Sequence, residues 1–142
     1  MSNPKSIAAL NELPEALTLF RQKLMPFVID ARGKRVEADL GDYAHIILDH
    51  PEMQSRVGWL EATLKNPLEI RQHPDRNKSF RELYINQIYT SEEEPFGEWH
   101  LVVIDARPFC KLWTSFIPQD ESYVRQIQKR GKLLWTRHLS IG

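Results

Sequence analysis

Hydrophobic and polar residues alternate in four short runs between Leu68 and Pro118, and turn-forming residues separate the runs. Alternation with a period of two is typical of β-strands in a sheet. The third run carries large apolar residues on both faces, which predicts a central strand buried on both sides. This stretch therefore predicts a meandering, four-stranded antiparallel sheet. The runs read LEIRQHP, SFRELYINQIYT, EWHLVVIDAR and KLWTSFIP.

Apolar residues recur at spacings of three and four ahead of these strands, which predicts amphipathic helices. Prolines bound the helices, because proline fits a first helical turn but disfavours helix at the residue before it. A turn reading Ala-Arg-Gly-Lys between two short apolar runs predicts a hairpin. The expected helices run from Leu13 to Leu24, from Leu40 to His50 and from Pro51 to Asn66, and the hairpin strands are Phe27–Asp30 and Arg35–Ala38.

A short helix is expected after the sheet, around Ser122–Arg130, with Asp120 or Ser122 as its cap and Gly131 at its end. The following KLLWTRHL predicts either a last strand or a docked extension. The predicted fold class is α+β, with N-terminal helices packed on a four-stranded antiparallel sheet and a short C-terminal helix.

Composition narrows the class of protein. The chain has 142 residues, of which 42% are hydrophobic and 27% charged, as in ordinary globular domains. We expect one domain over residues 1–142, with its core at about 40–135 and with residues 1–11 flexible. The single cysteine, Cys110, excludes an intramolecular disulfide and a cysteine-rich zinc site. The sequence has no signal-peptide pattern and no apolar run of about 18 residues, so a cytoplasmic protein without a membrane partner is expected.

The formal net charge is zero, but the charges are unevenly distributed. From Arg71 to Arg81 four basic residues accompany one acid, and from Lys111 to the end six accompany two. A local basic patch is one interpretation of this pattern, and scattered solvated charge is the other.

His45 is the first candidate for chemistry. Asp42 and Asp49 lie three residues before it and four after it, on the same side of the expected helix. A histidine near carboxylates changes its charge near neutral pH, as a general acid or base must. The alternative is a half-buried histidine bonded to Asp49.

Further candidates lie within the predicted strands. Arg71 and His73 share a face of the first strand, and Arg81 begins the second. Arginine matches phosphate oxygens and stabilises charge that builds on phosphorus, while tyrosine and tryptophan can stack on bases. Each candidate has a structural alternative, namely a charged edge strand or ordinary packing in the sheet. The other candidates are Tyr84, Asn86, Trp113, Thr114 and Ser115.

Other functional classes lack their signatures. The sequence contains no GxGxxG, GxxxxGK[ST], HExxH or GxSxG motif. The spacing of its histidines and aspartates matches no usual ligand pattern, so no metal and no cofactor are predicted. Cys110 has no adjacent histidine, which indicates an inert thiol.

The order of these features follows a family pattern. A helix histidine is followed by DHPEM, by a helix ending in NPLEI, and by strands reading FRELYIN, WHLVVID and LWTSFIP. This order, over about Tyr43 to Trp135, resembles the barnase–EndoU–colicin–RelE superfamily, specifically its phage-associated branch of nuclease-like domains.

The resemblance implies helices packed on a four-stranded antiparallel sheet and a metal-independent ribonuclease, often toxin-like, that needs no cofactor. In such enzymes the 2′-hydroxyl of RNA attacks the neighbouring phosphate. The expected partners are RNA and a protein inhibitor or antitoxin. The expected catalytic residues are His45, Arg81, Tyr84 and Thr114, and the expected substrate-binding residues are Arg71, His73, Asn86, Trp113 and Ser115.

One departure from the family pattern leaves a second interpretation open. Many members carry a lysine soon after the strand tyrosine, whereas Ile-Asn-Gln follows Tyr84 here. Arg81 or Arg71 would have to supply the positive charge. The alternative is a catalytically degenerate domain that binds RNA or a protein partner in a phage or toxin–antitoxin context. A domain without any nucleic-acid role is the third interpretation.

Overall fold

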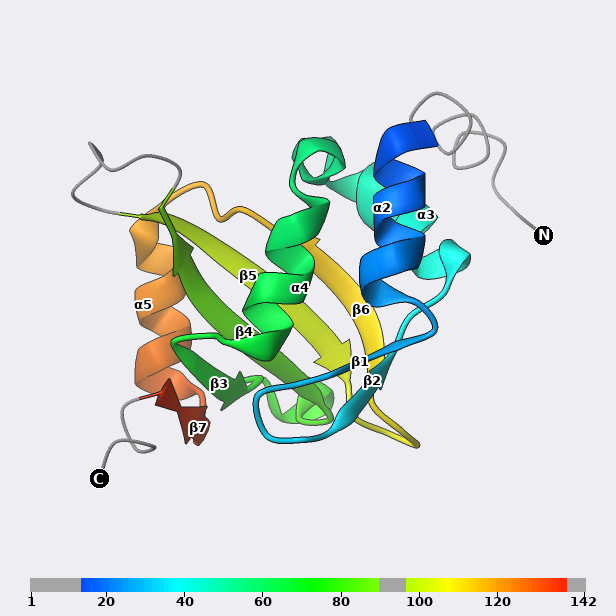
Figure 1. Cartoon of the computed structure of the whole chain (residues 1–142). Helices are drawn as coiled ribbons and strands as arrows, with labels where there is room; N and C mark the ends of the chain where they lie inside the picture. Colours follow the sequence, from blue (N-terminus) through cyan, green and yellow to red (C-terminus); the bar gives the residue numbers. More distant parts are fainter. Residues whose placement is uncertain (1–13, 90–96, 138–142) are drawn as a thin grey trace.

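The computed structural model describes residues 14–89 and 97–137 and has an α+β fold, as the sequence predicts. The strands are β1 (Phe27–Ile29), β2 (Arg35–Glu37), β3 (Glu69–Gln72), β4 (Arg81–Ile88), β5 (Glu98–Asp105), β6 (Lys111–Phe116) and β7 (Leu133–Thr136). They form one seven-stranded sheet in the order β1-β2-β6-β5-β4-β3-β7 (Figure 1). The four strands from β3 to β6 are adjacent and antiparallel, as predicted.

The predicted sheet was too limited, because the hairpin and the C-terminal strand join the same sheet. β2 pairs in parallel with β6 through Glu37 and Lys111, and the Glu37 amide donates to the Cys110 carbonyl oxygen at 2.9 Å. β7 pairs antiparallel with β3 at the opposite end of the sheet. These contacts lie far apart in sequence, and short strands carry too little periodicity to reveal them.

The predicted hairpin turn is confirmed as a three-residue loop. The Asp30 amide donates to the Lys34 carbonyl oxygen at 2.8 Å, and the Gly33 amide donates to the Asp30 carbonyl oxygen at 3.0 Å. Gly33 has a φ of 83°, which a residue without a side chain adopts at no steric cost. The loop therefore requires glycine at this position.

The helices lie where the spacing of apolar residues predicts them, except after Pro51. The helix expected from Pro51 divides into a short 3₁₀ turn and an α-helix, because the backbone of Arg56 has a φ of −129° and leaves the helical region. Met53 and Val57 are buried on either side of this break. The helical elements are α2 (Pro14–Leu24), α3 (Leu40–Asp49), η1 (Pro51–Ser55), α4 (Val57–Lys65), η2 (Arg76–Lys78) and α5 (Glu121–Arg130).

Alternate residues of the central strands face two separate cores. The even-numbered apolar residues of β4 and β5 pack under α2, α3 and α4, and the odd-numbered ones pack against Val124 and Ile127 of α5. Figure 1 shows α2 and α4 over one face and α5 apart from them, at the side of β4. β5 is therefore the central strand buried on both sides that its sequence predicts. Asp120 caps α5, since its carboxylate accepts from the Ser122 amide at 2.9 Å.

Two expectations fall on parts of the chain that the structure does not describe. Residues 1–11 and most of the acidic segment SEEEPFGE lie outside residues 14–89 and 97–137. Within those two ranges, no helix combines the length and the apolar character that a membrane span requires.

Candidate functional site

A β-bulge in β6 sets the position of Trp113. Val103 of β5 pairs with Thr114, whereas the next residue, Ile104, pairs with Leu112, so Trp113 is the extra residue. Leu112 is buried in the core beneath the helices, but Trp113 is 39% exposed. The bulge therefore brings a large aromatic ring to the surface of the sheet.

The Trp113 ring has a guanidinium group and an imidazole beside it. The Cζ atom of Arg81 is 4.5 Å from the centre of the Trp113 ring, and the ring centres of His45 and Trp113 are 5.5 Å apart. Arg81 comes from β4 and His45 from α3, so three elements converge on this ring. We call His45, Arg81 and Trp113 the Trp113 cluster. The structure thus brings together three of the residues predicted from the sequence.

Both basic residues of the Trp113 cluster lie beside a carboxylate. Arg81 Nε donates to Asp105 Oδ1 at 3.2 Å, and His45 Nε2 lies 3.5 Å from Asp49 Oδ2. The His45 side chain is 46% exposed and the Arg81 side chain 20%, so solvent reaches both pairs. Pairs of this kind are weak in water, and a phosphate can compete with the carboxylates.

The Thr114 hydroxyl is unusual in this setting. Its Oγ1 atom is buried and has no hydrogen-bond partner among the residues that the structure describes. A buried hydroxyl without a partner costs about 1–3 kcal/mol. Burial closes the Thr114 hydroxyl to a ligand at the surface, so Thr114 does not join the Trp113 cluster, although it follows Trp113 in sequence.

Three predicted site residues, Tyr84, Asn86 and Ser115, are buried, and none of them joins the Trp113 cluster. The Tyr84 hydroxyl donates to Asp30 Oδ2 at 2.5 Å and accepts from Arg32 at 2.9 Å. Burial raises the pKa of Tyr84 well above its ordinary value. In this structure the Tyr84 hydroxyl anchors the hairpin and does not reach a ligand on the exposed face.

Ser115 belongs to a buried network around His100, which the sequence analysis did not single out. His100 Nδ1 lies 2.7 Å from Thr63 Oγ1, and Nε2 lies 2.6 Å from Ser115 Oγ. Ser115 donates to the Leu101 carbonyl oxygen at 3.0 Å, so we assign the hydrogen to Nε2 of His100. A serine–histidine contact can also begin nucleophilic catalysis. Here both residues are fully buried, so the contact joins α4, β5 and β6.

Acidification is expected to destabilise the protein through His100. Burial lowers the pKa of this imidazole from 6.5 to about 3 in the folded state. Between these values only the unfolded chain binds the proton, so the free energy of unfolding falls by about 2 kcal/mol from pH 6.5 to pH 5. Urea titrations at both pH values measure this loss. His100→Gln should reduce it, and an unchanged pH dependence in that variant would contradict the assignment.

Arg71 makes its polar contacts away from the Trp113 cluster, whereas His73 is next to it, because the His73 amide donates to the Arg81 carbonyl oxygen at 2.9 Å. Arg71 donates to the Gly131 carbonyl oxygen at 2.9 Å and pairs with Glu69, so it ties β3 to the end of α5. His73 Nδ1 accepts from the Asp75 amide at 3.1 Å. Burial lowers the pKa of His73, and the positive charge of Lys78 lowers it further.

Phe80 and Arg107 extend the Trp113 cluster, and sequence reasoning missed both. The Phe80 ring centre is 5.5 Å from Arg81 Cζ and 5.4 Å from Arg107 Cζ. The Ala106 amide donates to the Phe80 carbonyl oxygen at 2.8 Å, which continues the pairing of β4 with β5. The sequence shows only that Phe80 precedes β4 and that Arg107 follows β5. The two residues meet because β4 and β5 pair with each other.

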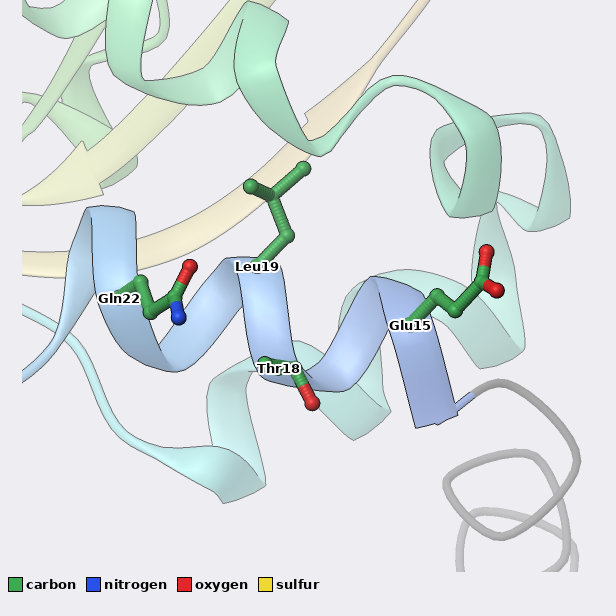
Figure 2. Close-up of a pocket in the computed structure, with 4 residues that line it drawn as sticks. All are labelled: Glu15, Thr18, Leu19 and Gln22. Carbon is green, nitrogen blue, oxygen red and sulfur yellow. The ribbon is translucent and has the colours of Figure 1, made fainter.

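A surface hollow lies elsewhere, on the outer side of α2. Its lining residues are Glu15, Thr18, Leu19 and Gln22. Figure 2 shows these side chains projecting in different directions from the one helix, so no polar groups converge. In the described part of the chain, no three His, Cys, Asp or Glu side chains are grouped so that they could hold a metal ion.

Comparison of this chain with protein-family models, with curated proteins and with solved structures gives no match. The resemblance to the barnase–EndoU–colicin–RelE superfamily therefore stays a prediction from the sequence.

Proposed function

We propose that this protein binds single-stranded RNA at the Trp113 cluster and cleaves it there. The observation that carries the proposal is an exposed indole with the guanidinium of Arg81 and the imidazole of His45 beside it. An unpaired base can stack on such a ring in any sequence context, and the guanidinium beside it can bind the adjoining phosphate.

The proposed chemistry uses the RNA itself as the nucleophile. His45 would take the proton of the 2′-hydroxyl, whose oxygen then attacks the neighbouring phosphorus to form a 2′,3′-cyclic phosphate. The 5′-oxygen of the next nucleotide leaves and takes a proton from water, which makes it a 5′-hydroxyl. Asp49, at 3.5 Å from Nε2, would orient the imidazole and leave Nδ1 as the proton acceptor. Arg81 would stabilise the charge that builds on the phosphate.

A second candidate is RNA binding without cleavage, and one observation favours it. Tyr84, the strand tyrosine of the predicted catalytic set, is bonded to Asp30 and Arg32 away from the Trp113 cluster. Catalysis would then depend on His45 and Arg81 without it. This candidate keeps the same binding surface and predicts RNA affinity that falls with salt.

Replacing Trp113 with alanine is expected to weaken RNA binding by about tenfold, because one base loses its stacking surface. Fluorescence anisotropy with a labelled, unstructured 2′-O-methyl RNA measures the affinity without cleavage. Tyr89→Ala is the control, since Tyr89 is an exposed aromatic just past the other end of β4. Failure of the wild-type protein to bind this RNA at low salt would overturn the proposal.

A further inference from the structure

Basic side chains and aromatic rings alternate in a row that continues beyond Trp113. Arg81 contacts the Trp113 ring at 4.5 Å and the Phe80 ring at 5.5 Å, so its guanidinium lies near both rings. On the Phe80 ring, Arg107 is a second cation at 5.4 Å. The row therefore runs His45, Trp113, Arg81, Phe80 and Arg107, with contributions from α3, β6, β4 and the segment after β5.

The far end of this row lies in positively charged surroundings. The His73 amide donates to the Arg81 carbonyl oxygen at 2.9 Å, which places the turn before β4 beside Arg81. The pKa of His73 is lowered first by burial and then by Lys78, while Asp75 raises it and Arg81 lowers it by less. Lys78 and Arg107 are both exposed. Lys78, Arg81 and Arg107 together outnumber the acids Asp75 and Asp105, and this excess of positive charge favours a polyanion as the partner.

We infer that Phe80, with Arg107 on its ring, is a second base-stacking subsite, so that the protein takes at least two consecutive unpaired nucleotides. The Arg81 guanidinium would hold the phosphate between the two bases, because it contacts both rings. Paired bases have their faces covered by their neighbours, so duplex RNA does not fit this arrangement. The inference rests on the proposed function, since it extends the same surface.

The test compares 2′-O-methyl oligouridylates of one, two and six nucleotides, which cannot be cleaved by 2′-hydroxyl attack. In the wild-type protein the second nucleotide should tighten binding by about tenfold, the contribution of one further stacked base. Phe80→Ala should abolish this gain while single-nucleotide binding remains. Phe80→Leu keeps an apolar side chain for packing and should lose the gain too. Tyr89→Ala is the control aromatic and should keep the gain.

Salt dependence tests the role of Arg107 separately. If its guanidinium contacts a phosphate of the hexanucleotide, Arg107→Gln should reduce the slope of log affinity against log salt by about 0.7. Arg125→Gln is the matched control, because Arg125 is also exposed and lies over a ring, that of Trp99, at 5.9 Å. It should leave the slope unchanged.

The outcomes separate the two proposals. If the wild-type protein binds no oligonucleotide, the proposed function is wrong and this inference falls with it. If the wild-type protein binds RNA but both Phe80 variants keep the full gain from the second nucleotide, only the second subsite is wrong. Binding of duplex RNA as tightly as the hexanucleotide would also overturn the second subsite.

Discussion

Replacing Asp30 with alanine is expected to lower the free energy of unfolding by about 3–5 kcal/mol, the usual cost of removing one partner from a buried ion pair. The Asp30 side chain is fully buried at the turn between β1 and β2. Its Oδ1 accepts from the amides of Arg32 and Lys34 at 2.9 and 2.8 Å. Its Oδ2 accepts from Arg32 Nε at 3.0 Å and from the Tyr84 hydroxyl at 2.5 Å. Alanine would leave all four donors without this acceptor.

Urea unfolding monitored by circular dichroism measures the effect. Asp30→Asn keeps the size and one carbonyl oxygen but loses the charge, so its stability should lie between those of the wild type and Asp30→Ala. Glu121→Ala removes an exposed carboxylate paired with Arg125 at 2.7 Å and should cost no more than about 1 kcal/mol. If Asp30→Ala were as mild as Glu121→Ala, the buried cluster would not hold the hairpin to the sheet.

Replacing His45 with alanine is expected to reduce the rate of RNA cleavage by about 10²-fold or more, the usual contribution of a general base. The imidazole is exposed, lies beside the stacking ring of Trp113 and has Asp49 as its carboxylate partner. The fold should tolerate the change, because an exposed i,i+4 pair contributes only about 0.3–0.5 kcal/mol. Single-turnover cleavage of a labelled RNA, followed on a gel, measures the rate.

Two controls test whether the lost rate is specific to His45 and whether the 2′-hydroxyl is the nucleophile. His50→Ala removes a histidine that pairs with Glu52 at 3.8 Å, outside the proposed site, and should leave the rate of cleavage within a few-fold of wild type. An RNA with deoxyribose at the cleaved position lacks the nucleophile and should stay intact. Equal cleavage by the wild-type protein and His45→Ala would remove His45 from the mechanism. If the wild-type protein binds RNA and leaves it intact, the second candidate function holds.

Patterns among residues that are neighbours in sequence predict most helices and strands of the fold. In β5 both the odd-numbered and the even-numbered residues are large and apolar, which predicts a strand buried on both faces. The structure covers one face with α2, α3 and α4 and the other with α5. The Ala-Arg-Gly-Lys turn predicts the hairpin because Gly33 must adopt a positive φ. Asp120 and Gly131 bound α5 as expected, since caps satisfy backbone groups within one turn of the chain. All of these features depend on neighbours in sequence.

The number of strands in the sheet could not be predicted from such local patterns. β2 joins β6 through a single residue pair, Glu37 and Lys111, which leaves no periodic pattern to detect. β7 was one of two alternatives, because a four-residue strand and a docked extension have similar sequences. Pairing between short strands that are far apart in the sequence depends on the tertiary structure of the whole chain.

For the candidate site, the sequence determined which residue types are present and the tertiary structure decided which of them meet. Period-two alternation gives the relative faces of residues within a strand, but the bulge at Trp113 interrupts that parity in β6. Tyr84 and Arg81 belong to the same strand, yet an odd spacing sends them to opposite faces. Tyr84 is then buried with Asp30, while Arg81 contacts Trp113. His45 reaches that ring only because α3 packs against β6, a contact between residues almost seventy positions apart that no local pattern encodes.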